Sequence, residues 1–392
     1  MVDQNSRADE EFREELRTWL SEHLTGEFAQ VAGRGSPSDD DAWDVRIEWE
    51  RELGRGGWIG LAWPRVYGGR QATYAQEVIF SLEYAKAGAP ARCTHFGESL
   101  LAPTLLAHGT QAQKERFLPP IQLADELWCQ GYSEPGAGSD LASVRTTAVP
   151  DGEQWRINGQ KVWTSFAHHA DWIFLLARTD PEAPRHRGIS YMLCPIDQPG
   201  VEIRPITSLA GRADFNEVFF TDATTAADMV VGPVNNGWAV AMSTLGHERA
   251  TSVLSYQFSF QREMEVLVDE VRRRGMGKDP MFRHRLAEAA VGLRVMAANN
   301  MRTLGRLARE GELGPEASVT KVFWSRWHKA FCELALDVLG PDAMLVDGAE
   351  PTGLQRSALM ALGETLYAGT TEIQLNIMAE RVLGLPREPR LA

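Results

Sequence analysis

Hydrophobic residues in the first third of the chain recur at the three- and four-residue spacing of an amphipathic helix. The first such run comprises Phe12, Leu16, Trp19, Leu20 and Leu24. Side chains at this spacing share one helix face, so the run predicts a helix. The same spacing predicts helices over residues 43–53, 75–87 and 98–107, with residues 33–38 as a loop between the first two helices.

Between residues 127 and 232 the pattern changes to short runs of apolar, β-branched and aromatic residues, which predict strands. These runs are Gln154–Ile157, Asp171–Ala177, Ile189–Cys194, Val201–Pro205 and Glu217–Thr221. The dipeptide Asn158-Gly159 lies between two such runs and is typical of a tight hairpin turn.

After Gly237 the helical spacing returns over residues 238–274, 281–310, 315–339 and 371–383. We therefore predict an α+β protein with three domains, which are helical over 1–126, β over 127–235 and helical over 236–392. This order is not the alternating βαβ order of a doubly wound nucleotide-binding fold. A Rossmann domain is thus not expected to hold any cofactor.

Composition and charge narrow the class of protein. The chain has 392 residues, of which 44% are hydrophobic, enough for the cores of two or three packed domains. No apolar run approaches bilayer length and the first ten residues are polar, so we expect a cytoplasmic protein without membrane association. A net charge of −13 argues against non-specific nucleic-acid binding, although a local basic pocket can still hold an anionic CoA.

Motifs for several common chemistries are missing. The four cysteines (Cys93, Cys129, Cys194 and Cys332) form no C-x-x-C pair, and we expect them to be reduced structural thiols. We find no G-x-G-x-x-G after a strand, no P-loop, no G-x-S-x-G and no H-E-x-x-H. Adjacent residues point to opposite faces of a strand, so His168 and His169 are expected to be a solvated loop pair. No metal site is predicted.

Three segments are unusual. The first is Tyr132-Ser133-Glu134-Pro135-Gly136-Ala137-Gly138-Ser139-Asp140, whose proline and glycines make a turn with exposed backbone N–H groups. Such a turn can surround an anionic or carbonyl-bearing ligand. Composition alone favours an ordinary surface turn.

The second segment is Lys161-Val162-Trp163-Thr164-Ser165. Strand alternation places Trp163 and Ser165 on one face. A planar cofactor would suit that pair, with the ring packing and the hydroxyl donating to a ring nitrogen. A core tryptophan beside a hydrogen-bonded serine explains the segment equally well.

The third segment is Tyr367-Ala368-Gly369-Thr370-Thr371-Glu372-Ile373-Gln374, which leads into the last long helix. Thr371 and Gln374 fit a capping box, so a well-capped helix accounts for it. The same helix N-terminus would also favour an anionic or carbonyl oxygen.

In this order, these segments resemble the acyl-CoA dehydrogenase family over nearly the whole chain. Three further stretches of this sequence carry the resemblance: Trp63-Pro64 with Tyr67-Gly68-Gly69, Gly109-Thr110 with Phe117-Leu118-Pro119, and Ala379-Glu380-Arg381-Val382-Leu383-Gly384. The resemblance implies a helical N-terminal domain, a middle β-barrel or sandwich and a C-terminal four-helix bundle. It also implies an oligomer with FAD extended between domains and subunits.

Residue roles follow from the resemblance by motif position. Tyr132 and Ser133 would contact the flavin, Trp163 its edge or face, and Ser165 its N5 region. Ser139 would contact the thioester. Thr370 and Glu372 would lie near the cofactor, and the backbone N–H of Ala368 would hold the substrate carbonyl.

The expected chemistry requires a carboxylate base for the α-proton and a polarised carbonyl, after which a hydride leaves the β-carbon for the flavin. Many family members carry the catalytic glutamate where this chain has Ala368. A second group of relatives carries it before an arginine early in the C-terminal domain. Here Glu248-Arg249 matches that stretch, so Glu248 is the expected base and Arg249 is expected to shape the site.

Other departures leave alternatives open. The Arg-x-Thr-Phe-Gly segment that touches the FAD pyrophosphate in relatives is missing, and residues 271–277 occupy the region. The expected partners are acyl-CoA and an electron-transferring flavoprotein, in a homodimer or homotetramer. The alternatives are a half-site subunit of a heteromeric dehydrogenase and a flavin monooxygenase on the same fold. The acyl group, and CoA versus a carrier protein, stay open.

Overall fold

The computed structural model describes residues 7–35, 40–310, 314, 317–346 and 353–387. Contacts divide the chain into two compact units. The first unit comprises Val2–Thr207 and Ala213–Glu248, and the second unit comprises Ser208–Arg212 and Arg249–Ala392. Within the described residues no helix has the length and apolarity to cross a membrane.

The first unit begins with helices, as the hydrophobic spacing predicts. They are α1 Arg7–His23, α2 Gly26–Gln30, α3 Trp43–Arg55, α4 Tyr74–Lys86, α5 Ala102–His108 and α6 Gln111–Gln122. Leu16, Trp49 and Leu53 are fully buried in the core that α1, α3 and α4 share. The predicted helix over 98–107 is a π-helix, Phe96–Leu101, that continues into α5.

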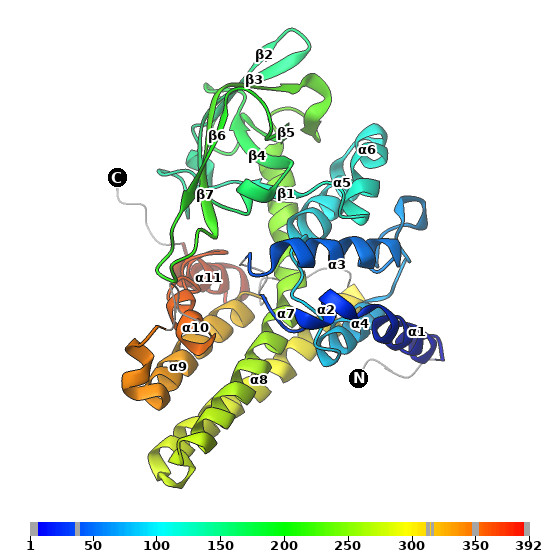
Figure 1. Cartoon of the computed structure of the whole chain (residues 1–392). Coiled ribbons are helices and arrows are strands. Elements are labelled where there is room, and N and C mark those ends of the chain that lie inside the picture. Colours follow the sequence, from blue (N-terminus) through cyan, green and yellow to red (C-terminus); the bar gives the residue numbers. More distant parts are fainter. Residues whose placement is uncertain (1–6, 36–39, 311–313, 315–316, 347–352, 388–392) are drawn as a thin grey trace. The chain divides into compact units, whose positions relative to one another are not determined.

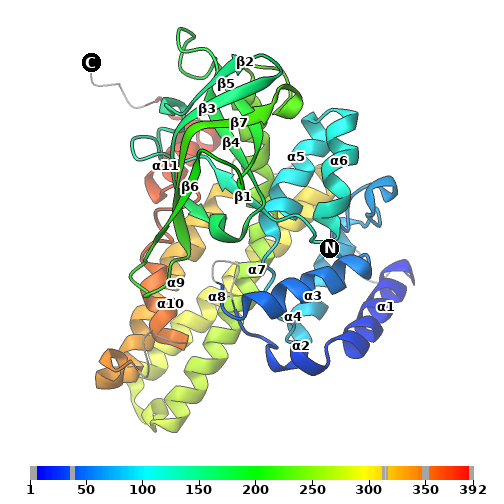
Figure 2. The same ribbon diagram turned by 45° about the horizontal axis from the view of Figure 1, so that its top comes forward.

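Eight strands follow and form one mixed sheet. They are β1 Trp128–Gly131, β2 Thr147–Asp151, β3 Gln154–Ser165, β4 Trp172–Arg178, β5 Ile189–Pro195, β6 Val201–Ile206, β7 Phe215–Ala226 and β8 Val230–Val231. The order is β6-β7-β3-β2-β4-β5-β8, with β1 parallel to β4. Figure 2 shows the strands gathered in one layer and α1 to α6 grouped in another. Phe117, Phe174 and Tyr191 pack in the core between these layers.

The predicted hairpin turn at Asn158-Gly159 is wrong. Strand β3 runs through both residues, and the turn that joins β2 to β3 lies at Gly152-Glu153, where Gly152 has a φ of 64°. Asn158 instead bonds across the sheet to Asp222 on β7. Gly159 stands at a register shift against β7. A Cβ at this position would lie 2.6 Å from the Cα of Thr146, so a larger residue would clash there.

The second unit is a helical bundle. Its elements are α7 Gly237–Arg273 (from Arg249 onward), α8 Pro280–Glu310, α9 Ala317–Leu339, α10 Gly353–Ala361, α11 Thr371–Ile377 and a π-helix, Met378–Val382. The long helices α7 and α8 form a hairpin (Figure 1). Phe260, Leu267, Leu293, Phe331 and Ala361 share the bundle core. Helices, sheet and helices thus follow one another in the predicted order.

Candidate functional site

The loop Tyr132–Asp140 is an ordered turn. Glu134 and Ala137 exchange two backbone hydrogen bonds of 3.0 Å each, with Pro135-Gly136 at the tip. The Tyr132 side chain is buried against Phe174. Ser133 is half-buried and Ser139 is exposed, so both serine hydroxyls lie where a ligand could reach them.

A buried ion pair fixes this loop to strand β3. The Nζ atom of Lys161 lies 2.8 Å from Oε1 of Glu134 and donates to the carbonyls of Tyr132 (3.2 Å) and Leu176 (2.7 Å). Burial lowers the pKa of Lys161 to about 8, because a buried ammonium is poorly solvated. The loop therefore cannot move without separating two buried charges.

Strand β3 bulges immediately after Lys161. Trp163 has a φ of 61°, and the register against β7 shifts between Lys161 and Thr164. Thr164 is fully buried, whereas Trp163 is 61% exposed and Ser165 is half-buried. The bulge presents a large aromatic ring and a hydroxyl outward from a rigid strand, and left-handed backbone at a non-glycine residue is often associated with a functional site. The exposed ring does not fit a core tryptophan.

The loop and the bulge are directly connected. The backbone N–H of Val162 donates to the carbonyl of Ser133 over 3.0 Å. The structure therefore brings Tyr132 and Ser133 together with Trp163 and Ser165 in one rigid part of the first unit. A flat aromatic group would fit this surface, since the exposed indole can pack on it beside hydroxyl donors.

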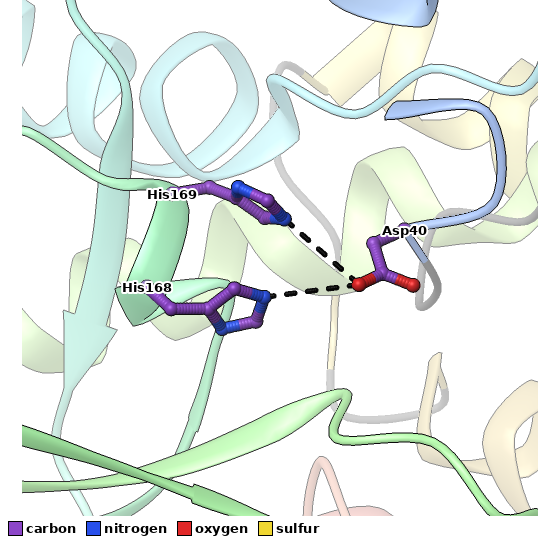
Figure 3. A group of neighbouring side chains, drawn as sticks. All are labelled: Asp40, His168 and His169. Carbon is purple, nitrogen blue, oxygen red and sulfur yellow. Dashed lines mark ion pairs between the residues drawn. The ribbon is translucent and has the colours of Figure 1, made fainter. Parts of the chain in front are cut away.

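The histidine pair differs in part from the prediction. His168 and His169 lie in a 3-10 turn, Ala167–His169, which does not alternate as a strand does. Both Nε2 atoms face Oδ2 of Asp40, at 3.8 and 3.9 Å (Figure 3). Their side chains are 24% and 27% exposed. As whole residues His168 is exposed and His169 is half-buried, so only His168 fits the expected solvated position.

The second unit carries the Ala368 turn. Ala368 and Gly369 have φ values of 51° and 84°, and the Gln374 amide donates to the Ala368 carbonyl over 3.1 Å. Ala368 is exposed. The predicted capping box of Thr371 and Gln374 is wrong by one position, because Thr370 is the N-cap of α11 and accepts from the Ile373 N–H at 3.2 Å.

Glu372 lies exposed in the first turn of α11. Its own backbone N–H and the Thr370 hydroxyl hold its pKa below the usual range. The structure thus gathers Ala368, Thr370 and Glu372 at one helix N-terminus, where the helix dipole favours negative charge. Glu248 and Arg249 lie in α7, but their side chains fall outside the described residues.

All three parts of the chain match one family. The N-terminal domain of acyl-CoA dehydrogenase matches residues 6–124, the middle domain 129–223 and the C-terminal domain 235–383. The chain belongs to the acyl-CoA dehydrogenase family. It is therefore an oxidoreductase, and its cofactor is FAD, on which the family depends.

Named relatives and solved structures agree with this assignment. Acyl-CoA dehydrogenase IpdE1 of Mycobacterium tuberculosis is 51% identical over 97% of this chain and 99% of the relative. The ChsE4-ChsE5 complex of M. tuberculosis is 32% identical, with a TM-score of 0.80 over 99% of this chain and 100% of that one. A structure titled "Tcur3481-Tcur3483 steroid ACAD" is 29% identical, with a TM-score of 0.85 and the same coverage.

Three features of the site escaped the sequence analysis. Lys161 and Glu134 both lie in segments with unusual composition, but nothing along the chain indicates that these two residues, 27 positions apart, form an ion pair. The turn of His168 and His169 toward Asp40 depends on a 3-10 turn that strand spacing does not predict. The bulge at Trp163 also could not be predicted, because the usual sequence sign of a bulge is a glycine within the strand and none lies at this position.

Proposed function

We propose that this protein removes two hydrogens from the α and β carbons of an acyl-CoA thioester to give the trans-2-enoyl-CoA, with Glu248 as the base. The exposed Trp163 beside Ser165, on a bulge locked to the Tyr132 loop, is the main structural support for a flavin surface. We also propose that the boundary between the N-terminal helical domain and the β domain lies between residues 126 and 127, and that the C-terminal helical domain begins at residue 236.

The flavin surface is assigned to residues of the first unit. Trp163 would pack on the flavin and the Ser165 hydroxyl would donate to its N5 region. Ser133 would contribute its hydroxyl, whereas buried Tyr132 would contribute backbone groups. Thr370 and Glu372 would lie near the cofactor, and Ser139 would contact the thioester. When bound, FAD supplies the acceptor for the β-hydride.

Proton removal is assigned to Glu248. An α-proton of a thioester is weakly acidic, so the reaction needs a carboxylate on one side and a polarised carbonyl on the other. Alanine at 368 has no group that can take a proton, but its backbone N–H could hold the carbonyl. Glu248 would take the α-proton, and Arg249 would shape the acyl site. An electron-transferring flavoprotein is the proposed acceptor that reoxidises the enzyme.

The first test is an absorbance spectrum of the purified protein, followed by anaerobic addition of a panel of acyl-CoA thioesters. Bleaching of the flavin band by a thioester, with the enoyl-CoA found as product, is the expected result.

Glu248→Gln should retain FAD but lose about 10²- to 10⁴-fold in the rate of flavin reduction, the usual contribution of a general base. Full activity of that variant would exclude Glu248 as the base.

A heteromeric enzyme is the second candidate. The titles of two related structures each name two chains, ChsE4-ChsE5 and Tcur3481-Tcur3483, and this chain lacks the Arg-x-Thr-Phe-Gly segment. Protein that takes up FAD only after a related subunit is added would support this candidate. Stable FAD binding by the protein alone would exclude it.

We further propose a bulky, polycyclic acyl group as the substrate class, since one relative's title describes a steroid enzyme. The panel should therefore include straight-chain, branched and steroid-derived thioesters of CoA. Faster flavin reduction by the steroid-derived thioesters is expected. Preference for a short straight chain would reject this substrate class and leave the reaction type intact.

A further inference from the structure

Three potential ligand atoms converge beside the bulge that carries Trp163. They are Nε2 of His168, Nε2 of His169 and Oδ2 of Asp40 (Figure 3). Both nitrogens lie 3.8–3.9 Å from the carboxylate oxygen. These separations are too long for hydrogen bonds. They are close to the spacing of ligands that share one metal ion at about 2.1 Å from each ligand atom.

The other side of each ring is already held in place. Nδ1 of His168 lies 3.1 Å from the Asn216 amide oxygen and 3.0 Å from its amide nitrogen, which also donates to the Thr164 carbonyl over 3.0 Å. In the tautomer whose Nδ1 donates to the Asn216 amide oxygen, Nε2 keeps a lone pair that faces Asp40. Second-shell contacts of this kind fix the tautomer of metal-binding histidines.

His169 is oriented by packing instead. Its ring stacks on Trp43, with centroids 4.1 Å apart and planes 11° apart. Its Nε2 atom is buried and has no hydrogen-bond partner in the part of the chain that the structure describes. A buried ring nitrogen without a partner is costly, and a bound cation would remove that cost.

We propose that Asp40, His168 and His169 bind one divalent transition-metal ion of the Zn²⁺ class. Two imidazole nitrogens and one carboxylate oxygen form a donor set that suits Zn²⁺ and its neighbours rather than Ca²⁺ or Mg²⁺. Asp40 is about one-third exposed, so water can complete the coordination. The ion would connect the segment before α3 to the turn after β3, and would therefore brace the Trp163 bulge.

Equilibrium dialysis of the FAD-loaded protein against Zn²⁺, with bound metal measured by mass spectrometry, tests the site. One equivalent is expected in the wild type, with at least about a tenfold loss of affinity in Asp40→Asn and His168→Ala, because three-ligand sites depend on each ligand. His284→Ala, which removes an exposed histidine beside Glu288, should retain one equivalent.

Co²⁺ gives a second readout. A tetrahedral Co²⁺ complex absorbs at longer wavelength than the flavin, so its bands should be present in the wild type and in His284→Ala but absent from the two site variants. Retained FAD in all variants shows that they are folded. Failure of the wild type to bind metal would mean that the three side chains do not form a metal site, and equal binding by all variants would place the metal elsewhere. Either result overturns the proposal, and neither bears on the dehydrogenase assignment.

Discussion

Lys161 and Glu134 form an ion pair of 2.8 Å from which solvent is almost excluded, with the two side chains 0% and 7% exposed. The Glu134 carboxylate also accepts from the backbone N–H groups of Arg145 and Thr146, at 2.6 and 2.9 Å. The pair lies between the Tyr132 loop and the Trp163 bulge. The ion pair therefore holds both segments of the proposed flavin surface in position.

Lys161→Met should cost about 3 kcal/mol in the free energy of unfolding, because it leaves a buried carboxylate without its partner. Glu134→Gln should cost less, and the double variant should recover part of the loss. The check is a double-mutant cycle by urea unfolding with FAD affinity measured in parallel. Arg272→Met, at a pair with Asp269 whose side chains are 74% and 75% exposed, should cost less than about 1 kcal/mol. Additive effects in the cycle would contradict the coupling.

Trp163 should matter for FAD but little for folding. Its ring is 61% exposed and makes an edge contact with Phe215 at 6.1 Å, so Trp163→Leu should change the free energy of unfolding by less than about 1 kcal/mol. FAD affinity should fall about tenfold, since base or ring stacking on an aromatic side chain contributes about 1–3 kcal/mol. Fluorescence titration with FAD measures the loss. Val149→Ala, another exposed apolar site on the sheet, is the control and should bind FAD normally.

The Ala368 turn offers a second place for a base. Ala368 is exposed at a φ of 51°, and a longer side chain there meets little steric resistance within its own unit. In a Glu248→Gln background, Ala368→Glu should raise the rate of flavin reduction by an acyl-CoA at least about tenfold. Ala368→Gln in the same background has the same size but cannot take a proton. Equal rates for the Glu and Gln variants would show that position 368 no longer reaches the α-carbon.

The sequence predicted most helices and strands well because the hydrophobic patterns that indicate them are local. The spacing of Phe12, Leu16 and Leu20 and the apolar runs of β4 and β5 indicate their elements directly. Errors occurred where tertiary packing overrides local preference. Asn158-Gly159 is a strong turn signal, yet pairing of β3 with β7 holds it in a strand. Helix α6 was not predicted, since Pro119 and Pro120 stand near its end and proline usually interrupts helices.

The site was less predictable than the fold. Trp163 and Ser165 could be proposed from alternation, but the positive φ that exposes Trp163 arises from the register shift between β3 and β7. The pairing of Lys161 with Glu134, and of both histidines with Asp40, depends on segments that are distant in sequence. Such contacts need the folded chain, because no periodicity along the sequence encodes them.

A buried histidine in the helical bundle predicts a pH-dependent stability. Nδ1 of His328 lies 2.8 Å from Glu364 and Nε2 lies 2.7 Å from Glu263. The ring therefore bridges two carboxylates as an imidazolium. Cys332 Sγ lies 3.5 Å from Nε2, and Lys321 donates to the Glu364 backbone carbonyl. Hydrogen bonds to Cys332 and the two carboxylates outweigh burial and hold the pKa of His328 well above its usual value.

A histidine whose pKa is raised by folding stabilises the protein fully below its unfolded pKa of about 6.5, and this stabilisation is lost as pH rises through the folded pKa. His328→Gln should therefore cost about 3 kcal/mol near pH 6, where the buried Glu364 and the half-buried Glu263 lose their cation, and less near pH 9. Urea unfolding at several pH values measures this gap. His284→Gln, at a 74% exposed histidine, should show no gap at any pH. A His328→Gln penalty that stays constant between the two pH values would mean that His328 is neutral in the folded bundle.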